Sequence, residues 1–129
     1  MRWKSVPWLC LIQEIFKQME YNNISTIDSL EKALRDNPFS LVYFSHQQCN
    51  VCKVLKPKVR ELIANNFPEV ALFYVDTVKY PEISGQLSVF TVPTILVFLE
   101  EKEYIRESRH INLSAFSERI EKLYKIYFE

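Results

Sequence analysis

The sequence predicts an α/β domain in which a mixed central sheet of four to five strands is flanked by helices on both faces. Two observations carry this prediction. Short apolar runs, typical of buried strands, alternate along the chain with segments of helical periodicity. The last two strand-like runs are separated by only a short polar turn, which indicates an antiparallel hairpin after the alternating part. A chain of 129 residues without a repeat or a linker is expected to form one domain.

The first predicted elements are a short edge strand over residues 21–24 and a helix that follows it. Residues 25–28 (Ser-Thr-Ile-Asp) supply side chains that can cap the start of this helix. Leu30 and Leu34 lie at helical spacing within it. The helix is expected to end before Pro38, because a residue that precedes proline disfavours the helical conformation.

Two buried strands and a long helix are predicted next. Residues 40–45 and 70–76 are apolar runs, so each is predicted to form a buried strand. The helix between them is expected to begin after Cys49 and to run to about Asn65. Pro57 lies inside it and is expected to kink it, because proline removes one backbone hydrogen bond.

The last part of the chain is predicted to contain a short helix, a hairpin and a final helix. Pro81 opens the short helix, which is expected to end near residue 87. Residues 94–99 and 103–108 predict two antiparallel strands, and the turn between them lacks the usual glycine. Asn112 is the predicted cap of the final helix.

Residues 1–20 are interpreted as an N-terminal extension with helical character, and residues 21–129 as the domain. The extension carries apolar residues at the spacing of an amphipathic helix: Leu9, Ile12, Ile15, Phe16 and Met19. Three interpretations stay open, namely an extra helix packed on the domain, an extension read from an upstream start, and a helix that binds a membrane or a partner. Cys10 is expected to be a buried apolar residue of this segment.

Composition excludes several classes of function. Sixteen basic and sixteen acidic side chains cancel, so no overall charge attracts nucleic acid. A single glycine argues against a phosphate-binding loop, and no cofactor is expected. The apolar run near the N-terminus is too short to span a bilayer, and a membrane-binding helix is the less expected of the interpretations open for residues 1–20. Three cysteines are too few for a secreted disulfide framework, which favours a reducing compartment and a cytoplasmic location.

A pair of cysteines at a strand-to-helix junction is the strongest functional motif. Cys49 and Cys52 are separated by two residues and lie at the start of the predicted long helix. The unpaired N–H groups and the positive dipole end of a helix N-terminus favour a thiolate over a thiol. Cys49 is therefore expected to be a nucleophile near neutral pH. Cys52, one turn on, can attack a mixed disulfide that Cys49 has formed.

From residue 25 to residue 127 the chain resembles the thioredoxin family. Three motifs carry the resemblance: Cys-Asn-Val-Cys-Lys at residues 49–53, Pro57 inside the following helix, and Thr-Val-Pro-Thr at residues 91–94 before an apolar strand. The resemblance implies the thioredoxin fold and a cis peptide bond before Pro93. It also implies a thiol–disulfide oxidoreductase that reduces protein disulfides, in which Cys49 attacks and Cys52 resolves the mixed disulfide.

The resemblance further implies substrate contacts and partners. The turn of Val92 and Pro93 would hold the substrate chain, and Gln48 and Arg109 would lie beside the same groove. Arg109 stands near a position where the family usually has glycine. It could attract an acidic target, stabilise the thiolate or obstruct the groove, and an exposed arginine that only contributes solubility is the alternative. The expected partners are disulfide-containing proteins and an electron donor of the thioredoxin-reductase kind.

The motif departs from the family pattern at several positions. Gln48 replaces the tryptophan before the first cysteine, and no proline lies between the two cysteines. The family's buried aspartate aligns with Tyr43, which is a much weaker base at neutral pH, and the lysine usual in the next strand is missing. His46, as an imidazolium, and Lys53 are candidates for groups that favour the Cys49 thiolate. A solvated loop histidine is the alternative for His46.

Two other classes of function stay open at this point. The missing tryptophan, proline, aspartate and lysine are compatible with a binding or scaffold protein whose cysteines are buried and inert. A small zinc-binding module is the third possibility, since His46, Cys49 and Cys52 offer three ligands and His110 or Cys10 could be the fourth. The absence of a second paired ligand cluster argues against zinc, and no metal site is expected.

Overall fold

Five strands form one sheet at the centre of the chain in this computed structural model, which describes residues 20–128. The strands are β1 (Asn22–Asn23), β2 (Phe39–Ser45), β3 (Ala71–Asp76), β4 (Thr94–Leu99) and β5 (Lys102–Ser108). Their order across the sheet is β1-β3-β2-β4-β5, with β1, β3 and β2 parallel and with β4 and β5 antiparallel to their neighbours. The predicted mixed sheet with a terminal hairpin is confirmed.

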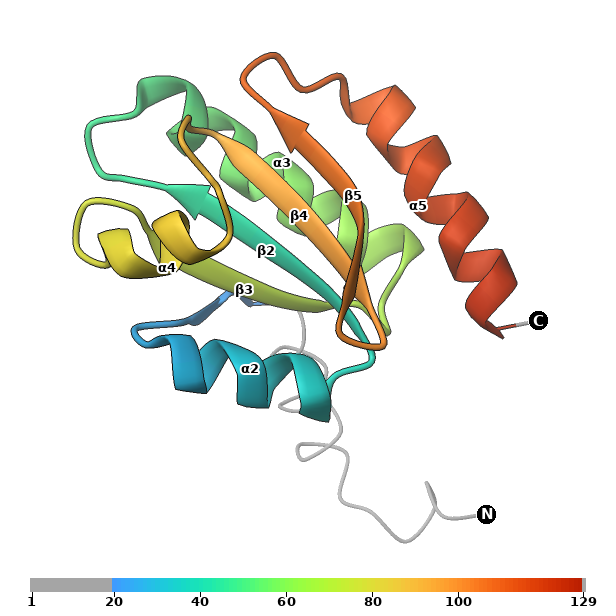
Figure 1. Cartoon of the computed structure of the whole chain (residues 1–129). Coiled ribbons are helices and arrows are strands. Elements are labelled where there is room, and N and C mark those ends of the chain that lie inside the picture. The colour runs from blue at the N-terminus through green and yellow to red at the C-terminus, as the bar shows by residue number, and fades with distance from the viewer. Residues whose placement is uncertain (1–19, 129) are drawn as a thin grey trace, which may run out of the picture.

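Helices cover both faces of the sheet (Figure 1). They are α2 (Ile27–Asp36), α3 (Asn50–Asn66), α4 (Pro81–Gln86) and α5 (Leu113–Phe128). Because successive side chains of a strand point to opposite faces, β2 contributes to two separate cores. Leu41 and Tyr43 pack on the side of α3 and α5, whereas Val42 and Phe44 pack on the side of α2 and α4.

The helix boundaries agree with the capping chemistry expected from the sequence. Thr26 caps α2 in a reciprocal pair with Ser29, in which each side chain accepts from the other residue's backbone N–H. Asn112 caps α5, since its side-chain oxygen accepts from the N–H of Ala115 at 3.1 Å. Pro57 lies inside α3, which continues for nine residues beyond it to Asn66.

The predicted N-terminal helix, with Cys10 and the apolar residues from Leu9 to Met19, lies outside the described residues. Within residues 20–128, none of the helices combines the length and the apolar character that crossing a membrane requires.

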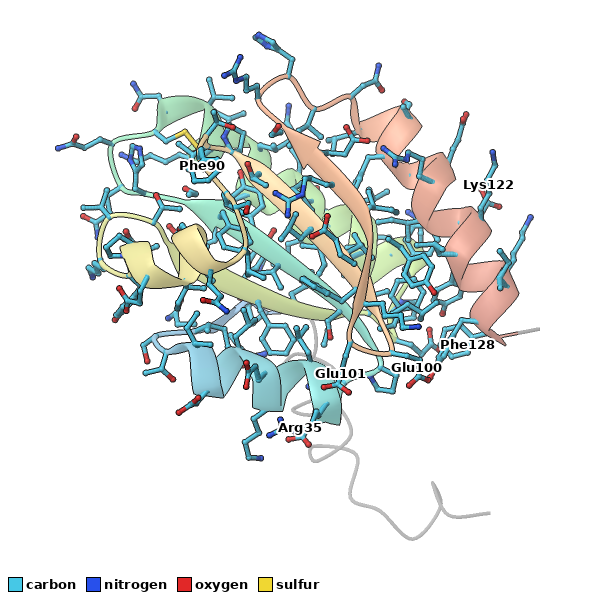
Figure 2. The ribbon with its side chains drawn as sticks, in the orientation of Figure 1. Arg35, Phe90, Glu100, Glu101, Lys122 and Phe128 are labelled. Atoms are coloured by element: carbon cyan, nitrogen blue, oxygen red, sulfur yellow. A yellow bond between two sulfur atoms is a disulfide. The ribbon has the colours of Figure 1, made fainter. Side chains whose placement is uncertain are left out.

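The hairpin between β4 and β5 turns on two glutamates with left-handed backbones. Glu100 has φ 52° and Glu101 has φ 68°, and both lie at the tip of the hairpin in Figure 2. Two-residue hairpin turns require this conformation, which glycine and asparagine adopt more easily than glutamate. The pairing also shifts register between Val97 and Phe98, so that β5 carries one extra residue, Tyr104. The missing turn glycine is therefore replaced by backbone strain.

Replacing Glu101 with glycine should stabilise the fold. Glycine adopts positive φ without the Cβ clash, and its greater freedom in the unfolded chain offsets part of that gain, so we expect the free energy of unfolding to rise by about 0.5–1 kcal/mol. Urea titration measures the change. The matched control is Glu118→Gly in α5, where the same substitution should lower stability by about 1 kcal/mol. A loss of stability in Glu101→Gly would contradict strain at this turn.

Candidate active site

Cys49 is the residue that caps the N-terminus of α3. It follows the end of β2 by four residues, and its N–H donates to the carbonyl of His46 at 3.2 Å. Its Sγ accepts from the backbone N–H of Cys52 at 3.2 Å, so sulfur takes the place that an oxygen has in an ordinary N-cap. The sulfur thus receives one of the unpaired N–H groups of the helix and lies at the positive end of its dipole.

Cys49 and Cys52 form a disulfide, with their Cα atoms 5.3 Å apart (Figure 2). The two residues differ in accessibility, since Cys49 is partly exposed and Cys52 is only 1% exposed. A large substrate can therefore reach Cys49 and not Cys52. The inner sulfur lies within bonding distance of the outer one, which is the geometry that an internal resolving step needs.

The peptide bond between Val92 and Pro93 is cis, which confirms the expectation from the sequence. The turn lies close to the cysteine pair because β2 and β4 are neighbours, with Phe44 of β2 paired to Thr94 of β4. His46 from the loop before Cys49 and Val92 line the same cavity of about 400 Å³. The end of β2 and the start of β4 therefore place the sulfur and the cis peptide at one edge of the sheet.

A buried tyrosine lies beneath the pair where the family usually has a carboxylate. Tyr43 is fully buried, and its hydroxyl donates to the carbonyl of Cys52 at 2.9 Å. Burial, with a smaller contribution from Tyr74, raises the pKa of the Tyr43 phenol well above its usual value. The phenol therefore remains a neutral donor at physiological pH and positions the first turn of α3 without accepting a proton.

Lys56 lies over the aromatic floor of the site. Its Nζ is 3.8 Å from the ring centroid of Tyr74 and 5.1 Å from that of Tyr21. Burial lowers the pKa of this lysine, and the nearby Glu20 opposes the shift. The hydroxyl of Tyr21 donates to the backbone carbonyl of Lys56 at 2.9 Å. The charged end of Lys56, a residue of α3, thus lies beside the rings of Tyr21 and Tyr74.

The cavity beside Cys52 measures about 410 Å³, and Lys53, Lys56 and Asp76 contribute to its wall. Lys56 was not among the site residues expected from the sequence. Its spacing of four residues from Cys52 on the same helix face was the available signal, since such residues are neighbours on a helix surface.

The other residues singled out from the sequence lie around this edge. Gln48 is exposed, and its N–H donates to Nδ1 of His46 at 3.2 Å. Lys53 is exposed. Arg109 lies next to the cis peptide bond, since its N–H donates to the carbonyl of Pro93 at 2.9 Å. The roles expected for these side chains stay predictions. In the part of the chain that the structure describes, no three His, Cys, Asp or Glu side chains are grouped as a metal site would need.

The chain is similar to known proteins both in sequence and in structure. A model of the thioredoxin family matches residues 5–122. The thioredoxin-like protein YdfQ of Bacillus subtilis is 29% identical over 108 residues, which cover 84% of this chain and 96% of that protein. A thioredoxin from Fasciola hepatica has a TM-score of 0.71 and 31% identity, covering 78% of this chain and 97% of its own. A thioredoxin from Trypanosoma brucei brucei has a TM-score of 0.75 at 18% identity, covering 84% and 94%.

Replacing Tyr43 with phenylalanine should weaken the fold of the oxidised protein. The ring volume is kept, but the buried Cys52 carbonyl loses the phenol donor, and we expect a loss of about 1–2 kcal/mol in unfolding free energy at pH 7. Urea titration measures it, with Tyr104→Phe on the exposed face of β5 as the matched control, which should change little. Equal effects of the two substitutions would contradict a structural role for the Tyr43 hydroxyl.

The stabilities of the wild type and of Tyr43→Phe should respond differently to high pH. The pKa of Tyr43 is raised in the folded state, so its stabilising contribution is complete below the unfolded value of about 10 and declines as pH rises above that value. The unfolding free energy of the wild type should therefore fall above about pH 10 more steeply than that of Tyr43→Phe. A gap between the two that widens above this pH would contradict the burial of a neutral phenol.

Proposed function

This chain belongs to the thioredoxin family and is a thiol–disulfide oxidoreductase, and on that premise we propose that it reduces disulfides of protein substrates, with Cys49 as the attacking sulfur and Cys52 as the resolving sulfur. The observation that carries the proposal is the partly exposed residue Cys49, whose sulfur accepts an N–H bond at the N-terminus of α3 and is bonded to the sulfur of the buried Cys52. A scaffold with inert cysteines is not favoured, because an inert pair needs neither this exposure nor this pairing.

The proposed cycle transfers two electrons from the cysteine pair to the substrate. The Cys49 thiolate attacks one sulfur of the substrate disulfide, forming a mixed disulfide and releasing the other substrate sulfur as a thiolate, which takes a proton from water. The Cys52 thiolate then attacks Cys49, forming the Cys49–Cys52 disulfide and releasing the second substrate sulfur, which is protonated in turn. The substrate is reduced and the pair is oxidised, so an external dithiol donor must restore it.

The turn of Val92 and Pro93 is proposed to hold the substrate chain. Within residues 20–128, no hydrogen bond uses the N–H or the carbonyl of Val92. Buried or half-buried backbone groups normally have partners, so an extended substrate segment is a suitable one. We assign Gln48 to the other side of the same groove, because it is exposed and immediately precedes Cys49.

We propose that the Cys52 thiol loses its proton into the cavity that it lines. Tyr43 holds its own proton at neutral pH, so it cannot take the role of the family's aspartate. Lys53 and Lys56 line this cavity, and nearby ammonium groups favour a thiolate over a thiol. His46 lines the same cavity.

The proposed partners and location follow from the direction of this reaction. Protein disulfides are the substrates, and an electron donor of the thioredoxin-reductase kind would return the oxidised pair to the dithiol. A reducing compartment such as the cytoplasm suits this direction of electron flow. Residues 21–129 are proposed to carry the whole reaction, because every residue named in the cycle lies there.

Serine variants of the two cysteines test the cycle. With dithiothreitol as donor and insulin as substrate, Cys49→Ser should reduce insulin no faster than the uncatalysed reaction, because the nucleophile is gone. Cys52→Ser should accumulate a mixed disulfide with the substrate, visible by mass spectrometry, because the resolving sulfur is gone. Cys10→Ser is the matched control and should keep wild-type activity. Equal activity of Cys49→Ser and wild type would sink the proposed function.

A further inference from the structure

Arg109 holds a left-handed backbone directly beside the cis peptide. Its φ is 64°, a conformation that costs free energy for any residue with a side chain and that glycine adopts freely. Its N–H donates to the carbonyl of Pro93 at 2.9 Å, so its position relative to the substrate turn is fixed. Strained residues persist where the surrounding structure holds them and are frequent at functional sites. A glycine would relieve this strain, so an arginine at this position indicates a role for its side chain.

Arg109 borders a pocket of about 460 Å³ between the loop before β4 and the end of β5. Phe90 stands on the same pocket and is 82% exposed, an unusual situation for a phenylalanine (Figure 2). Thr91 and Ser108 add hydroxyl groups, and among residues 20–128 no aspartate or glutamate contributes to the wall. The pocket therefore combines an apolar ring and hydrogen-bonding groups with positive charge.

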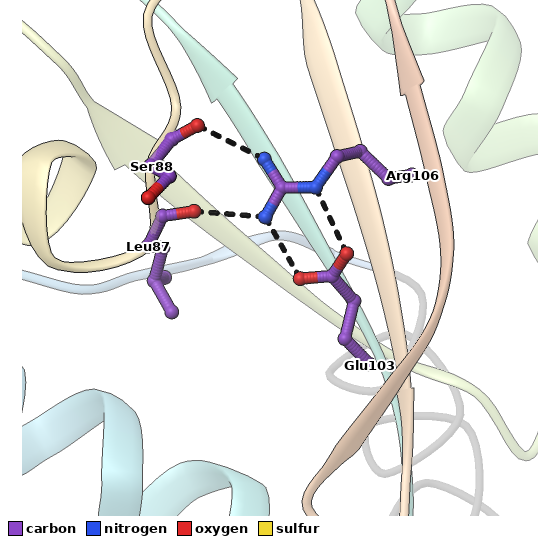
Figure 3. Close-up of polar contacts among 4 residues, drawn as sticks. All are labelled: Leu87, Ser88, Glu103 and Arg106. Atoms are coloured by element: carbon purple, nitrogen blue, oxygen red, sulfur yellow. Dashed lines mark hydrogen bonds and ion pairs between the residues drawn. The ribbon is translucent and has the colours of Figure 1, made fainter.

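The second arginine of this pocket is already engaged (Figure 3). Arg106 donates from Nε and Nη2 to the two carboxylate oxygens of Glu103 at 2.9 and 2.8 Å. It also donates to the carbonyls of Leu87 and Ser88 at 2.8 and 3.1 Å. This arginine thereby fixes the loop that presents Phe90, and its charge is balanced by Glu103.

Arg109, in contrast, takes part in none of the ion pairs within residues 20–128. The neighbouring carboxylate, Glu107, is paired with Arg119. An unbalanced guanidinium next to an exposed aromatic ring suits a partner that brings both a carboxylate and an apolar side chain.

We propose that Arg109 and Phe90 form a specificity site for substrates that carry an aspartate or glutamate, together with an apolar residue, close to the reactive cysteine. This inference rests on the proposed function and adds the class of protein disulfide that it acts on. The carboxylate would pair with Arg109 while the backbone on either side of the substrate cysteine lies along Val92. An acidic substrate would be attracted on approach, and a basic one repelled.

Two peptide disulfides that differ at one position test this site. They have the same sequence except for glutamate or lysine two residues from the cysteine, and the measured quantity is the ratio of their kcat/KM values. We expect the wild type to prefer the glutamate peptide by about fivefold at low salt, the upper range for an exposed ion pair, and less at 0.5 M NaCl. Arg109→Lys should keep most of the preference, and Arg109→Ala should lose it.

Arg109→Gly separates selectivity from folding. It should lose the preference for glutamate and unfold at a higher urea concentration than the wild type, because glycine relieves the positive φ. If Arg109 had only a structural role, Arg109→Gly would be more stable than the wild type and would keep the preference for the glutamate peptide. The matched control is Arg35→Ala, which removes an exposed arginine of α2 that does not line this pocket. It should keep the wild-type ratio.

The outcomes distinguish the two proposals. If the wild type reduces both peptides equally, or if Arg109→Gly keeps the preference, the specificity site is overturned while the proposed function stands. If the wild type reduces neither peptide faster than Cys49→Ser does, the proposed function fails and this inference fails with it.

Discussion

The function proposed for this chain depends on one contact, in which the Cys49 sulfur accepts the N–H of Cys52 at the first turn of α3. This contact exists because β2, buried along its whole length, delivers the chain to a fixed edge of the sheet. Val59 and Ile63 then hold α3 against the same sheet, so the helix N-terminus cannot move away from the sulfur. The chemistry at the edge is therefore a consequence of packing in the core.

Beneath that contact, the chain has aromatic groups where the resemblance to thioredoxins implies a buried aspartate and, in the next strand, a lysine. Tyr43 and Tyr74 occupy paired positions of β2 and β3 with their ring centroids 6.4 Å apart, and Lys56 covers them from the helix. A buried carboxylate needs a partner to offset the loss of its hydration, whereas a phenol needs only one hydrogen bond. The floor of the site is thus neutral, and the charges that can assist Cys52 lie in the cavity beside it.

Much of this arrangement was predictable from the sequence, for identifiable reasons. Caps such as Thr26 and Asn112 act on their immediate neighbours, and apolar runs such as residues 40–45 report burial directly, so these elements agree with expectation. The cis bond before Pro93 was predictable because only proline forms it readily.

Features that depend on distant parts of the chain were not predictable. The contact of Lys56 with Tyr21 and Tyr74 needs the packing of α3 on β3 and on the residue before β1, which no local pattern encodes. The left-handed backbones of Glu100 and Glu101 gave no signal either, because glutamate is not a residue that turns of this kind select. A position of Arg109 near the turn was expected from the sequence, whereas its left-handed backbone was not, because arginine is not a residue that this conformation selects.

The most direct test of the central contact is the pH dependence of alkylation at Cys49 in the reduced protein. Iodoacetamide labelling, resolved by mass spectrometry of the Cys49 peptide, gives the pH at which half of the limiting rate is reached. A sulfur that accepts a helix N–H should react as a thiolate at a midpoint clearly below the value of about 8.5 for a free cysteine. A midpoint at or above that value would contradict the account, because the helix would then give the sulfur no stabilisation as an anion.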